Sequence, residues 1–223
     1  MDFGLSFSYV FKDKEWFKKL AIPALCSLIP VVGQFILAGW GYQATKNVID
    51  GKVENALPDL DFGGDLVRGF LAAVIAFLYG LPVMIIVIIA NLIFTFTADS
   101  SGEAIAVIMT IFGACLGIIG ILIGVLIAFM SVAGVANFIA KGRFGAAFNF
   151  KEVFGLLKKS FVSWLLVIIG QMIALGIIAP LGLIVCVIGV LLTSAYGIAI
   201  YSHLLGQAYN KSATPALGEV DVL

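Results

Sequence analysis

Charged residues are scarce in this chain, at 12% of 223 residues against 62% apolar residues. A soluble domain is typically about a quarter charged, and a water-soluble fold needs polar side chains to cover its surface. The mean hydropathy of +1.15 shows that this chain has too few polar side chains for such a surface. The formal net charge is zero, so no basic excess points to nucleic acid,. The surface must therefore meet lipid.

Cysteine and histidine are equally sparse. Cys26, Cys115 and Cys186 all fall inside apolar runs, and an odd number without a C-x-x-C pair indicates neither a disulfide framework nor a zinc site. His203 is the single histidine, which excludes a multi-histidine metal site and weakens any catalytic dyad. We expect no metal, no cofactor and no enzymatic activity, and a structural role for His203.

Ionised side chains are absent from four long apolar runs, Leu20–Tyr42, Gly69–Thr97, Ala104–Ala140 and Phe161–Leu205. A spanning helix needs about 20 residues. The last run is too long for one crossing and predicts two helices that meet near Pro180, because proline restricts the residue before it. The sequence therefore predicts an all-α integral membrane protein with four full transmembrane helices in the last three runs.

The first run is different because it contains Pro23, Pro30 and Gly33. It is either one kinked span or a short re-entrant hairpin with its tip near Pro30. If it re-enters, all thirteen basic residues of the chain fall on one face, as the positive-inside rule expects of the cytoplasmic side. We favour the re-entrant hairpin, in a plasma membrane, with both termini cytoplasmic.

A threefold internal repeat is predicted within a single membrane domain, residues 1–223, with units at approximately 7–52, 60–143 and 148–211. Each unit opens with an apolar, a helix-capping and an aromatic residue, and each closes at a glycine followed by a polar residue. The openings are Phe7-Ser8-Tyr9, Leu60-Asp61-Phe62 and Phe148-Asn149-Phe150, and the closures are Gly51-Lys52, Gly142-Arg143 and Gly206-Gln207.

Amphipathic helices are expected at the membrane surface. Phe150, Val153, Phe154, Leu157 and Phe161 form one helical stripe, with lysines mostly off it, which is typical of a helix lying in the interface,. The segment that leads into the first run resembles it. The basic and aromatic residues of both segments are predicted to anchor the protein at anionic headgroups. These interfacial anchors are Trp16, Lys18, Lys19, Lys158 and Lys159.

Asn149 and Glu152 have the spacing of a capping box at the start of the second of these helices,. Inside the membrane, polar and small residues have separate predicted roles. Gln34, Asn91, Gln171 and His203 are expected to make polar contacts, for Gln34 and Asn91 with a neighbouring helix,. Two small-x-x-x-small steps predict close helix packing along the third run, at Gly113, Gly117, Gly120 and Gly124,.

Several short patterns resemble the domain of unknown function 4013 family of prokaryotic multi-pass membrane proteins. They are Phe7-x-Tyr9 followed by Asp13 and Trp16, then Leu28-Ile29-Pro30-x-x-Gly33, Gly41-Tyr42, Leu57-Pro58 and, most specifically, Gly142-Arg143-Phe144-Gly145-Ala146-Ala147-Phe148. The resemblance implies an archaeal or bacterial origin and a plasma-membrane location. It implies no activity and no site residues.

Three classes of function remain open. A non-catalytic scaffold or accessory subunit of a membrane complex is favoured, because it needs only lipid-facing helices, packing glycines and interfacial anchors. Its partners would be the lipid bilayer and other membrane subunits, or a second copy of the chain, with no nucleic acid. A transporter or channel for an uncharged or apolar solute is the alternative, supported by the repeat and the broken first run. A membrane enzyme is disfavoured because no catalytic constellation can be assembled.

Overall fold

The structure of the protein, a computed structural model, describes residues 1–98 and 102–213, and all regular structure in these residues is helical. The helices in chain order are α1 Phe3–Ser8, the 3-10 helix η1 Tyr9–Lys12, α2 Trp16–Cys26, α3 Val32–Ile49, α4 Phe62–Ala98, α5 Glu103–Lys141, the 3-10 helix η2 Phe144–Phe148, α6 Phe150–Lys159, α7 Phe161–Ile173, the π-helix η3 Ala174–Ile178, α8 Ala179–Leu181, the 3-10 helix η4 Gly182–Val185 and α9 Cys186–Ala213.

Four helical segments are long and apolar enough to cross a membrane. This confirms the four spans expected from the last three apolar runs. The predicted joint between the second and third runs falls partly on residues 99–101, and with it Ser100, outside the described residues. The segments are Phe62–Thr95, Val107–Lys141, Phe161–Ile184 and Ile188–Ala213.

The first apolar run is broken into two helices. α2 ends at Cys26 and α3 begins at Val32, and neither helix is one of the four candidate spans. Val31 has a φ of 64°, in the left-handed region. The break also requires glycine at position 33, because a Cβ there would overlap the carbonyl of Cys26. With 11 residues, α2 extends for about 16 Å, too short to cross a hydrocarbon core of about 30 Å,.

The turn of the last apolar run lies later than predicted. The chain reverses over Gly182–Cys186 rather than at Pro180, which stays helical at the start of α8. The preceding π-helix Ala174–Ile178 shifts the hydrogen-bond ladder, which accommodates a residue without an N–H,. The Thr193 hydroxyl of α9 then donates to the carbonyl of Ala179, at 2.7 Å. The proline therefore bends the helix, and the reversal follows it.

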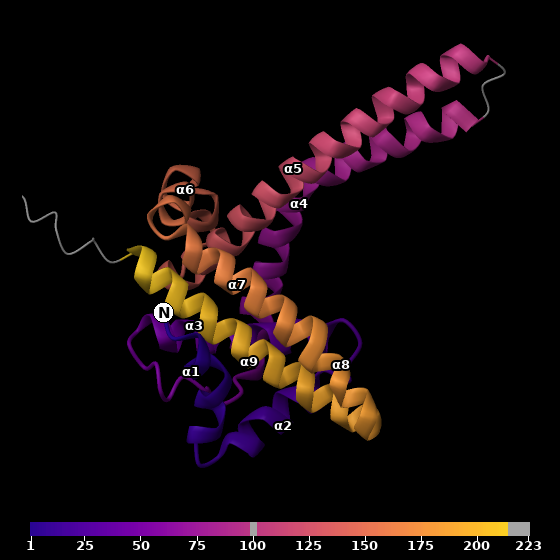
Figure 1. The fold of residues 1–223 in the computed structure, drawn as a ribbon. Helices are drawn as coiled ribbons and strands as arrows, with labels where there is room; N and C mark the ends of the chain where they lie inside the picture. The colour runs from indigo at the N-terminus through magenta and orange to yellow at the C-terminus, as the bar shows by residue number, and fades with distance from the viewer. Residues whose placement is uncertain (99–101, 214–223) are drawn as a thin grey trace, which may run out of the picture.

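Helix α9 is the centre of the body of the molecule, with α3, α7 and α2 packed around it (Figure 1). Its contact with α3 depends on glycines: a Cβ at Gly41 would overlap Ile198, and one at Gly206 would lie against Val48. The Thr45 hydroxyl donates to the carbonyl of Ser202 at 3.0 Å. Because contacts advance together along both helices, α3 and α9 run in the same direction.

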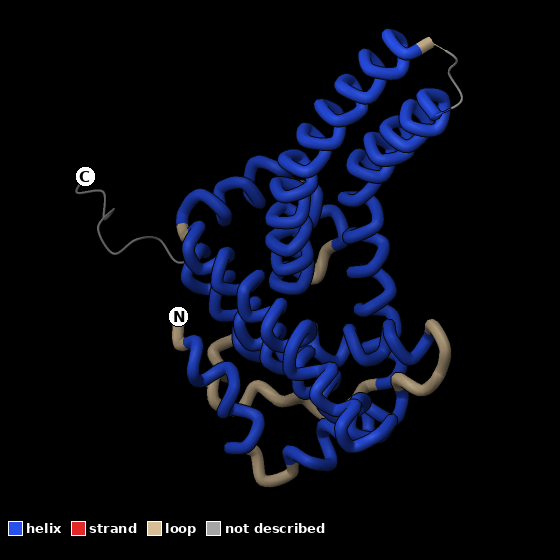
Figure 2. The backbone as a smooth tube through the Cα atoms, turned by 45° about the vertical axis from the view of Figure 1, so that its right-hand side comes forward, coloured by secondary structure: helices blue, strands red, loops and turns tan. Residues whose placement is uncertain are grey.

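The α4–α5 hairpin leaves this body and projects away from it (Figures 1 and 2). Only its base packs closely, against α3. A Cβ at Gly69 would overlap the backbone of Phe35, and one at Gly39 would overlap that of Asp65. In the most apolar 18-residue stretch of each helix, 17% of the α4 stretch and 6% of the α5 stretch is buried inside the protein. The outer part of the hairpin therefore has few protein neighbours other than its own second helix.

The apolar side chains of helix α6 point in two directions, some into the body of the protein and some outwards. Val153, Leu156 and Leu157 are buried against the body, whereas Phe150 and Phe154 are 56% and 55% exposed. The predicted single stripe is thus wrong in detail, because Leu156 faces the protein and the two phenylalanines face outwards. One half of the predicted capping box is observed: the Asn149 side chain accepts from the amide of Glu152 at 3.4 Å, whereas the Asn149 amide donates to the carbonyl of Ala146 rather than to Glu152.

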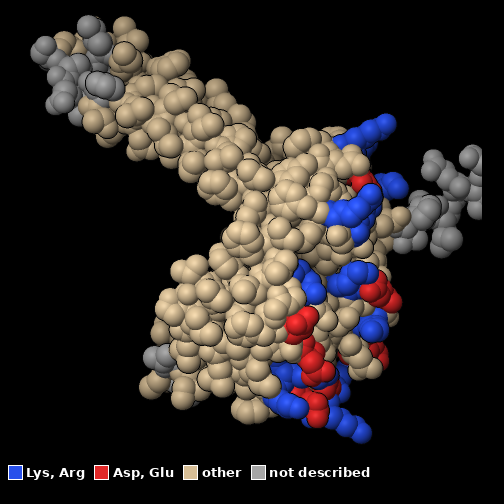
Figure 3. Space-filling view, turned by 180° about the vertical axis from the view of Figure 1, so that it is seen from behind, with Lys and Arg blue, Asp and Glu red and all other residues tan. Residues whose placement is uncertain are grey.

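Charged side chains gather along one edge of the molecule, and the projecting middle part of the α4–α5 hairpin, residues 69–98 and 104–140, contains none (Figure 3). This edge holds the start of α2, the end of α3, the start of α4 and the segment from the end of α5 through α6. The apolar hairpins extend away from it. The observed distribution matches the charge sidedness expected from the sequence.

The threefold repeat stays a prediction, although its first two closures are alike. Gly51 and Gly142 both have a positive φ, of 91° and 64°. In each case an asparagine side chain donates to the carbonyl of the alanine nine residues later, from Asn47 to Ala56 and from Asn137 to Ala146. Gly206 differs because it lies inside α9.

Two glycines of α4 provide a test of this packing. Gly69→Ala is expected to lower the thermal midpoint, because its methyl group would overlap the Phe35 carbonyl. Gly80→Ala is the matched control in the same helix, since no atom lies within 4 Å of a Cβ there. It should raise stability by up to about 1 kcal/mol through helix propensity. Thermal unfolding in detergent measures both, and equal midpoints would contradict the close α3–α4 contact.

Candidate functional site

The single histidine lies in a polar cluster that is closed to solvent. His203 Nε2 is 2.8 Å from the carbonyl oxygen of Val53, and His203 Nδ1 is 2.9 Å from both Ser6 Oγ and Gln207 Nε2. A carbonyl can only accept, so the proton resides on Nε2 and Nδ1 accepts from the serine and the amide. Ser6 and His203 are both 0% exposed.

This cluster ties the N-terminal helix to the end of α9. The Tyr9 ring stacks on the His203 ring at 4.2 Å, and the Tyr9 hydroxyl donates to the carbonyl of Ala199 at 3.1 Å. Gln207 Nε2 also donates to the carbonyl of Asp2, at 3.0 Å. The serine and histidine have the spacing of a nucleophile and base, but their burial leaves no room for a substrate. Their arrangement is that of a structural clamp.

A second polar cluster lies under the Gly142–Phe148 loop. Asn137, which is fully buried, donates through Nδ2 to the carbonyl of Ala146 at 2.9 Å and to Glu152 Oε2 at 3.2 Å. The Tyr79 hydroxyl donates to the carbonyl of Ala147 at 2.6 Å. The family-like stretch is therefore a loop whose carbonyls are held by buried donors from α4 and α5.

Glu152 connects this loop to α6. It forms an ion pair with Lys141 and accepts from Asn149 Nδ2 at 3.1 Å. The hydrogen bond from Lys141 lowers the pKa of Glu152, against partial burial, and the bond from Asn137 lowers it further. The carboxylate is thus ionised at neutral pH with its oxygens occupied. Sequence reasoning identified Glu152 only as a capping residue, and its other partners come from α5.

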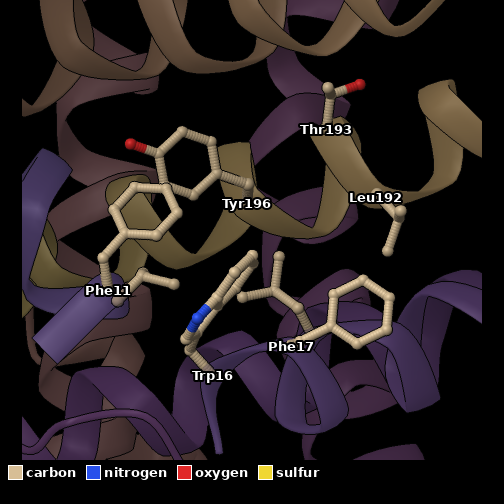
Figure 4. Close-up of a pocket in the computed structure, with 8 residues that line it drawn as sticks. Phe11, Trp16, Phe17, Leu192, Thr193 and Tyr196 are labelled. Carbon is tan, nitrogen blue, oxygen red and sulfur yellow. The ribbon is translucent and has the colours of Figure 1, made fainter. Parts of the chain in front are cut away.

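A groove lined by aromatic side chains lies between α2 and α9 (Figure 4). Its volume is about 210 Å³. Trp16 and Phe17 rise from α2 towards Leu192 and Tyr196 of α9, and Phe11 closes one side. The Tyr196 hydroxyl does not donate to a ligand in the groove, because it donates to the carbonyl of Phe7 at 2.6 Å. The groove therefore presents apolar surface to anything that enters it.

The predicted anchors separate into two kinds. Lys18, Lys158 and Lys159 are exposed, as an anchor requires, whereas Lys19 is held by the protein. Lys19 Nζ is 2.8 Å from Asp13 Oδ2, which raises the pKa of Lys19. The pKa of Asp13 is lowered: burial, the largest single contribution, would raise it, but the hydrogen bonds from Lys19 and from the Glu15 amide, together with the charge of Lys19, outweigh burial. Lys19 thus serves to fix the turn before α2.

The intramembrane polar residues do not share a site. Gln34 Nε2 donates to the carbonyl of Ser27 at 3.3 Å, across the α2–α3 break. Asn91 Nδ2 donates at 2.8 Å to the carbonyl of Val87, in its own helix, which differs from the expected interhelical bond because α4 is exposed at that depth. Gln171 is half-buried on α7. Gln34, Asn91 and Gln171 are all absent from the lining of the α2–α9 groove, of the cavity between α5 and α6, and of the groove along the α4–α5 hairpin.

The predicted packing glycines face the partner helix within their own hairpin. A Cβ at Gly113 would lie 3.7 Å from Ile93 of α4, one at Gly120 would lie 3.0 Å from Ile86, and one at Gly124 would lie 3.8 Å from Val83. Gly117 has no atom within 4 Å of its Cβ position. Residues 1–98 and 102–213 contain no group of three potential metal-ligating histidine, cysteine or acidic side chains.

The clamp generates a prediction with a control in the same helix. Ser6→Ala removes a buried donor to His203 and should cost about 1 kcal/mol,, which lowers the thermal midpoint by roughly 2–4 °C. Ser8→Ala should leave it nearly unchanged, since Ser8 is exposed and bonds only within its own turn. Both are measured by thermal unfolding in detergent. If Ser8→Ala is as destabilised as Ser6→Ala, the buried cluster is not what holds the N-terminal helix.

Comparison with known sequences matches the profile described as "Protein of unknown function (DUF4013)" to residues 22–194. Comparisons with curated proteins and with solved structures give no significant match. The matched region runs from within α2 into α9 and includes the Gly142–Phe148 loop, whereas Phe7, Tyr9, Asp13 and Trp16 precede it. Since the profile matches well over half of the 223 residues, the chain belongs to the DUF4013 family of proteins of unknown function.

Proposed function

We propose that this protein is a non-catalytic scaffold or accessory subunit of a complex in the plasma membrane. The observation that carries the proposal is the α4–α5 hairpin, whose residues 69–98 and 104–140 contain no charged side chain and whose most apolar stretches are little buried by the rest of the chain. In lipid, helices associate through close packing at small residues rather than through a hydrophobic drive. A projecting hairpin with such residues on one side is suited to receive a helix of another subunit.

Small residues do line one side of this hairpin. A groove with a volume of about 460 Å³ runs between the two helices. Ala76 and Gly80 line it from α4, and Gly124 and Ala128 line it from α5. Each pair has small-x-x-x-small spacing, so the groove has low walls on both sides. A cavity lined by Gln34, Asn91 and Gln171 would instead support a transporter, but Gln34 and Asn91 bond to carbonyls close in the chain, and Gln171 lines none of the cavities described.

The groove is the place to test the proposal. A photo-crosslinking residue at Met84, which lines the groove, should give one discrete protein adduct in cells. The same residue at Ile85, 53% exposed and on another side of α4, is the control and should react with lipid. No atom lies within 4 Å of a Cβ at Gly80, so Gly80→Leu should extend its side chain into the groove and abolish the adduct, while the purified protein should keep its thermal midpoint.

The opposite results would favour the other class of function. If Met84 reacts only with lipid and Gly80→Leu changes nothing, the scaffold proposal fails. Uptake of an uncharged solute into vesicles that contain the purified chain alone would support the transporter.

Topology is the second part of the proposal: both termini cytoplasmic and the α2–α3 pair re-entrant. It is supported by the single charged edge (Figure 3) and by the shortness of α2. In a background without Cys26, Cys115 and Cys186, an impermeant maleimide should label Gly102→Cys in intact cells. It should label Lys14→Cys only after permeabilisation. Labelling of Lys14→Cys from outside would overturn the re-entrant topology.

A further inference from the structure

The charged edge is uneven in sign. Residues 1–68 contain seven basic and eight acidic residues, whereas residues 141–159 contain five basic residues and one acidic residue. Figure 3 shows the difference: blue and red side chains are mixed over the lower part of the edge, and blue predominates in the upper part, where α6 lies. A local excess of positive charge is therefore concentrated on the segment that follows α5.

A cavity opens within this basic segment. It has a volume of about 350 Å³ and lies between the end of α5, the η2 loop and the start of α6. Its lining is mainly polar, and its two cationic side chains are Lys141 and Arg143. The remaining lining residues are Gly145, Ala146, Asn149 and Glu152.

The one acidic group in the cavity does not neutralise both cations. Glu152 Oε1 pairs with Lys141, and Oε2 accepts from Asn137 at 3.2 Å and from Asn149 at 3.1 Å. Arg143 is exposed, and no carboxylate of the described residues lies within 4 Å of its guanidinium group. A guanidinium presents five N–H donors in a planar fork that matches two phosphate oxygens. Arg143 lines the cavity, and although its charge helps to lower the pKa of Glu152, it forms no ion pair with that carboxylate, which is bonded to Lys141.

The surroundings of the cavity identify the kind of phosphate. α5, which ends at Lys141, is a candidate membrane span, so the cavity lies at the level where headgroups meet the hydrocarbon. Phe144, Phe150 and Phe154 do not line the cavity, but they lie on the η2 loop and α6 that carry it and are 37%, 56% and 55% exposed. Exposed aromatic side chains beside cations are the arrangement found at membrane interfaces. A lipid headgroup reaches this position laterally, with its acyl chains beside the phenylalanines.

We propose that this cavity binds the phosphate of an anionic phospholipid, with Arg143 as the principal ligand and Lys141 as a second cation. The site is independent of the scaffold function, because it lies where α5 ends, at η2 and the start of α6, and shares no lining residue with the hairpin groove. It gives the Gly142–Phe148 loop a role besides closing the turn: the loop fixes Arg143 at the mouth of the cavity. A net negative headgroup is favoured because the segment as a whole is cationic.

The test compares lipid binding to the purified full chain. Native mass spectrometry in nonionic detergent would count phosphatidylglycerol and phosphatidylcholine molecules bound across a titration. Arg143→Gln should weaken phosphatidylglycerol binding by roughly fivefold, the factor that corresponds to about 1 kcal/mol per cation near an anionic lipid surface. Arg143→Lys should retain part of the affinity, since it keeps the charge without the fork. Phosphatidylcholine binding should change little.

Lys52→Gln is the matched control. Lys52 also follows a glycine of positive φ and is exposed, but it does not line this cavity. It should bind phosphatidylglycerol like the wild type, and an unchanged thermal midpoint of Arg143→Gln shows that the variant is folded. Equal binding by wild type and Arg143→Gln would overturn the site, as would equal losses in Arg143→Gln and Lys52→Gln. If millimolar inorganic phosphate displaces the lipid, the site binds a free anion and the proposed lipid ligand is wrong.

Discussion

The capture of loop carbonyls by single buried side chains is the interaction on which this fold depends. Wherever a helix ends, carbonyl groups lose their intrahelical partners, and at membrane depth no water replaces them. Here side-chain donors of the described residues, some close in the chain and some distant, hold seven such carbonyls. The donors and acceptors are Trp40 to Pro58, Asn47 to Ala56, Asn137 to Ala146, Tyr79 to Ala147, Trp164 to Leu156, His203 to Val53 and Asn210 to Val48.

These bonds divide the molecule into a locked end and an open end. The donors connect the loops at the charged edge to the helices beneath them, and α9 contributes to several of the contacts. Among the described residues in the far part of the α4–α5 hairpin, no such bond to a loop carbonyl is seen. The polar groups there bond within their own helix, as Asn91 does to Val87 and Thr95 to Asn91. The stable edge therefore holds the orientation of a hairpin whose apolar surface is available to lipid or to another subunit.

The same arrangement places the proposed functions at different sites. The hairpin groove takes its character from small residues that leave space, whereas the Arg143 cavity takes its character from a cation that the protein does not neutralise. Within the basic segment, Glu152 determines which cation stabilises the loop and which one stays available to a ligand. It occupies Lys141 and the buried Asn137 and so completes the loop, and it leaves Arg143 to face outwards.

Several residues show where sequence reasoning succeeded and where it failed. The Asn149–Glu152 cap and the break after Pro23 and Pro30 follow from local chemistry, and both are observed. Lys19 was expected to face lipid, but Asp13 holds it. His203 had no evident partner, because Ser6 lies 197 residues away in the chain. A pattern along one helix cannot reveal a contact that depends on which helices become neighbours.

The sequence by itself determined that the protein meets lipid, that four helices are long enough to span it and that every lysine and arginine lies outside the long apolar runs. Each of these follows from composition and from periods within a single segment. Only the tertiary structure decided which donors hold the loops, which cations are paired and that one hairpin leaves the body. Those outcomes depend on distances between segments far apart in the chain, and apolar helices carry little information about their neighbours because almost any apolar surface can face lipid.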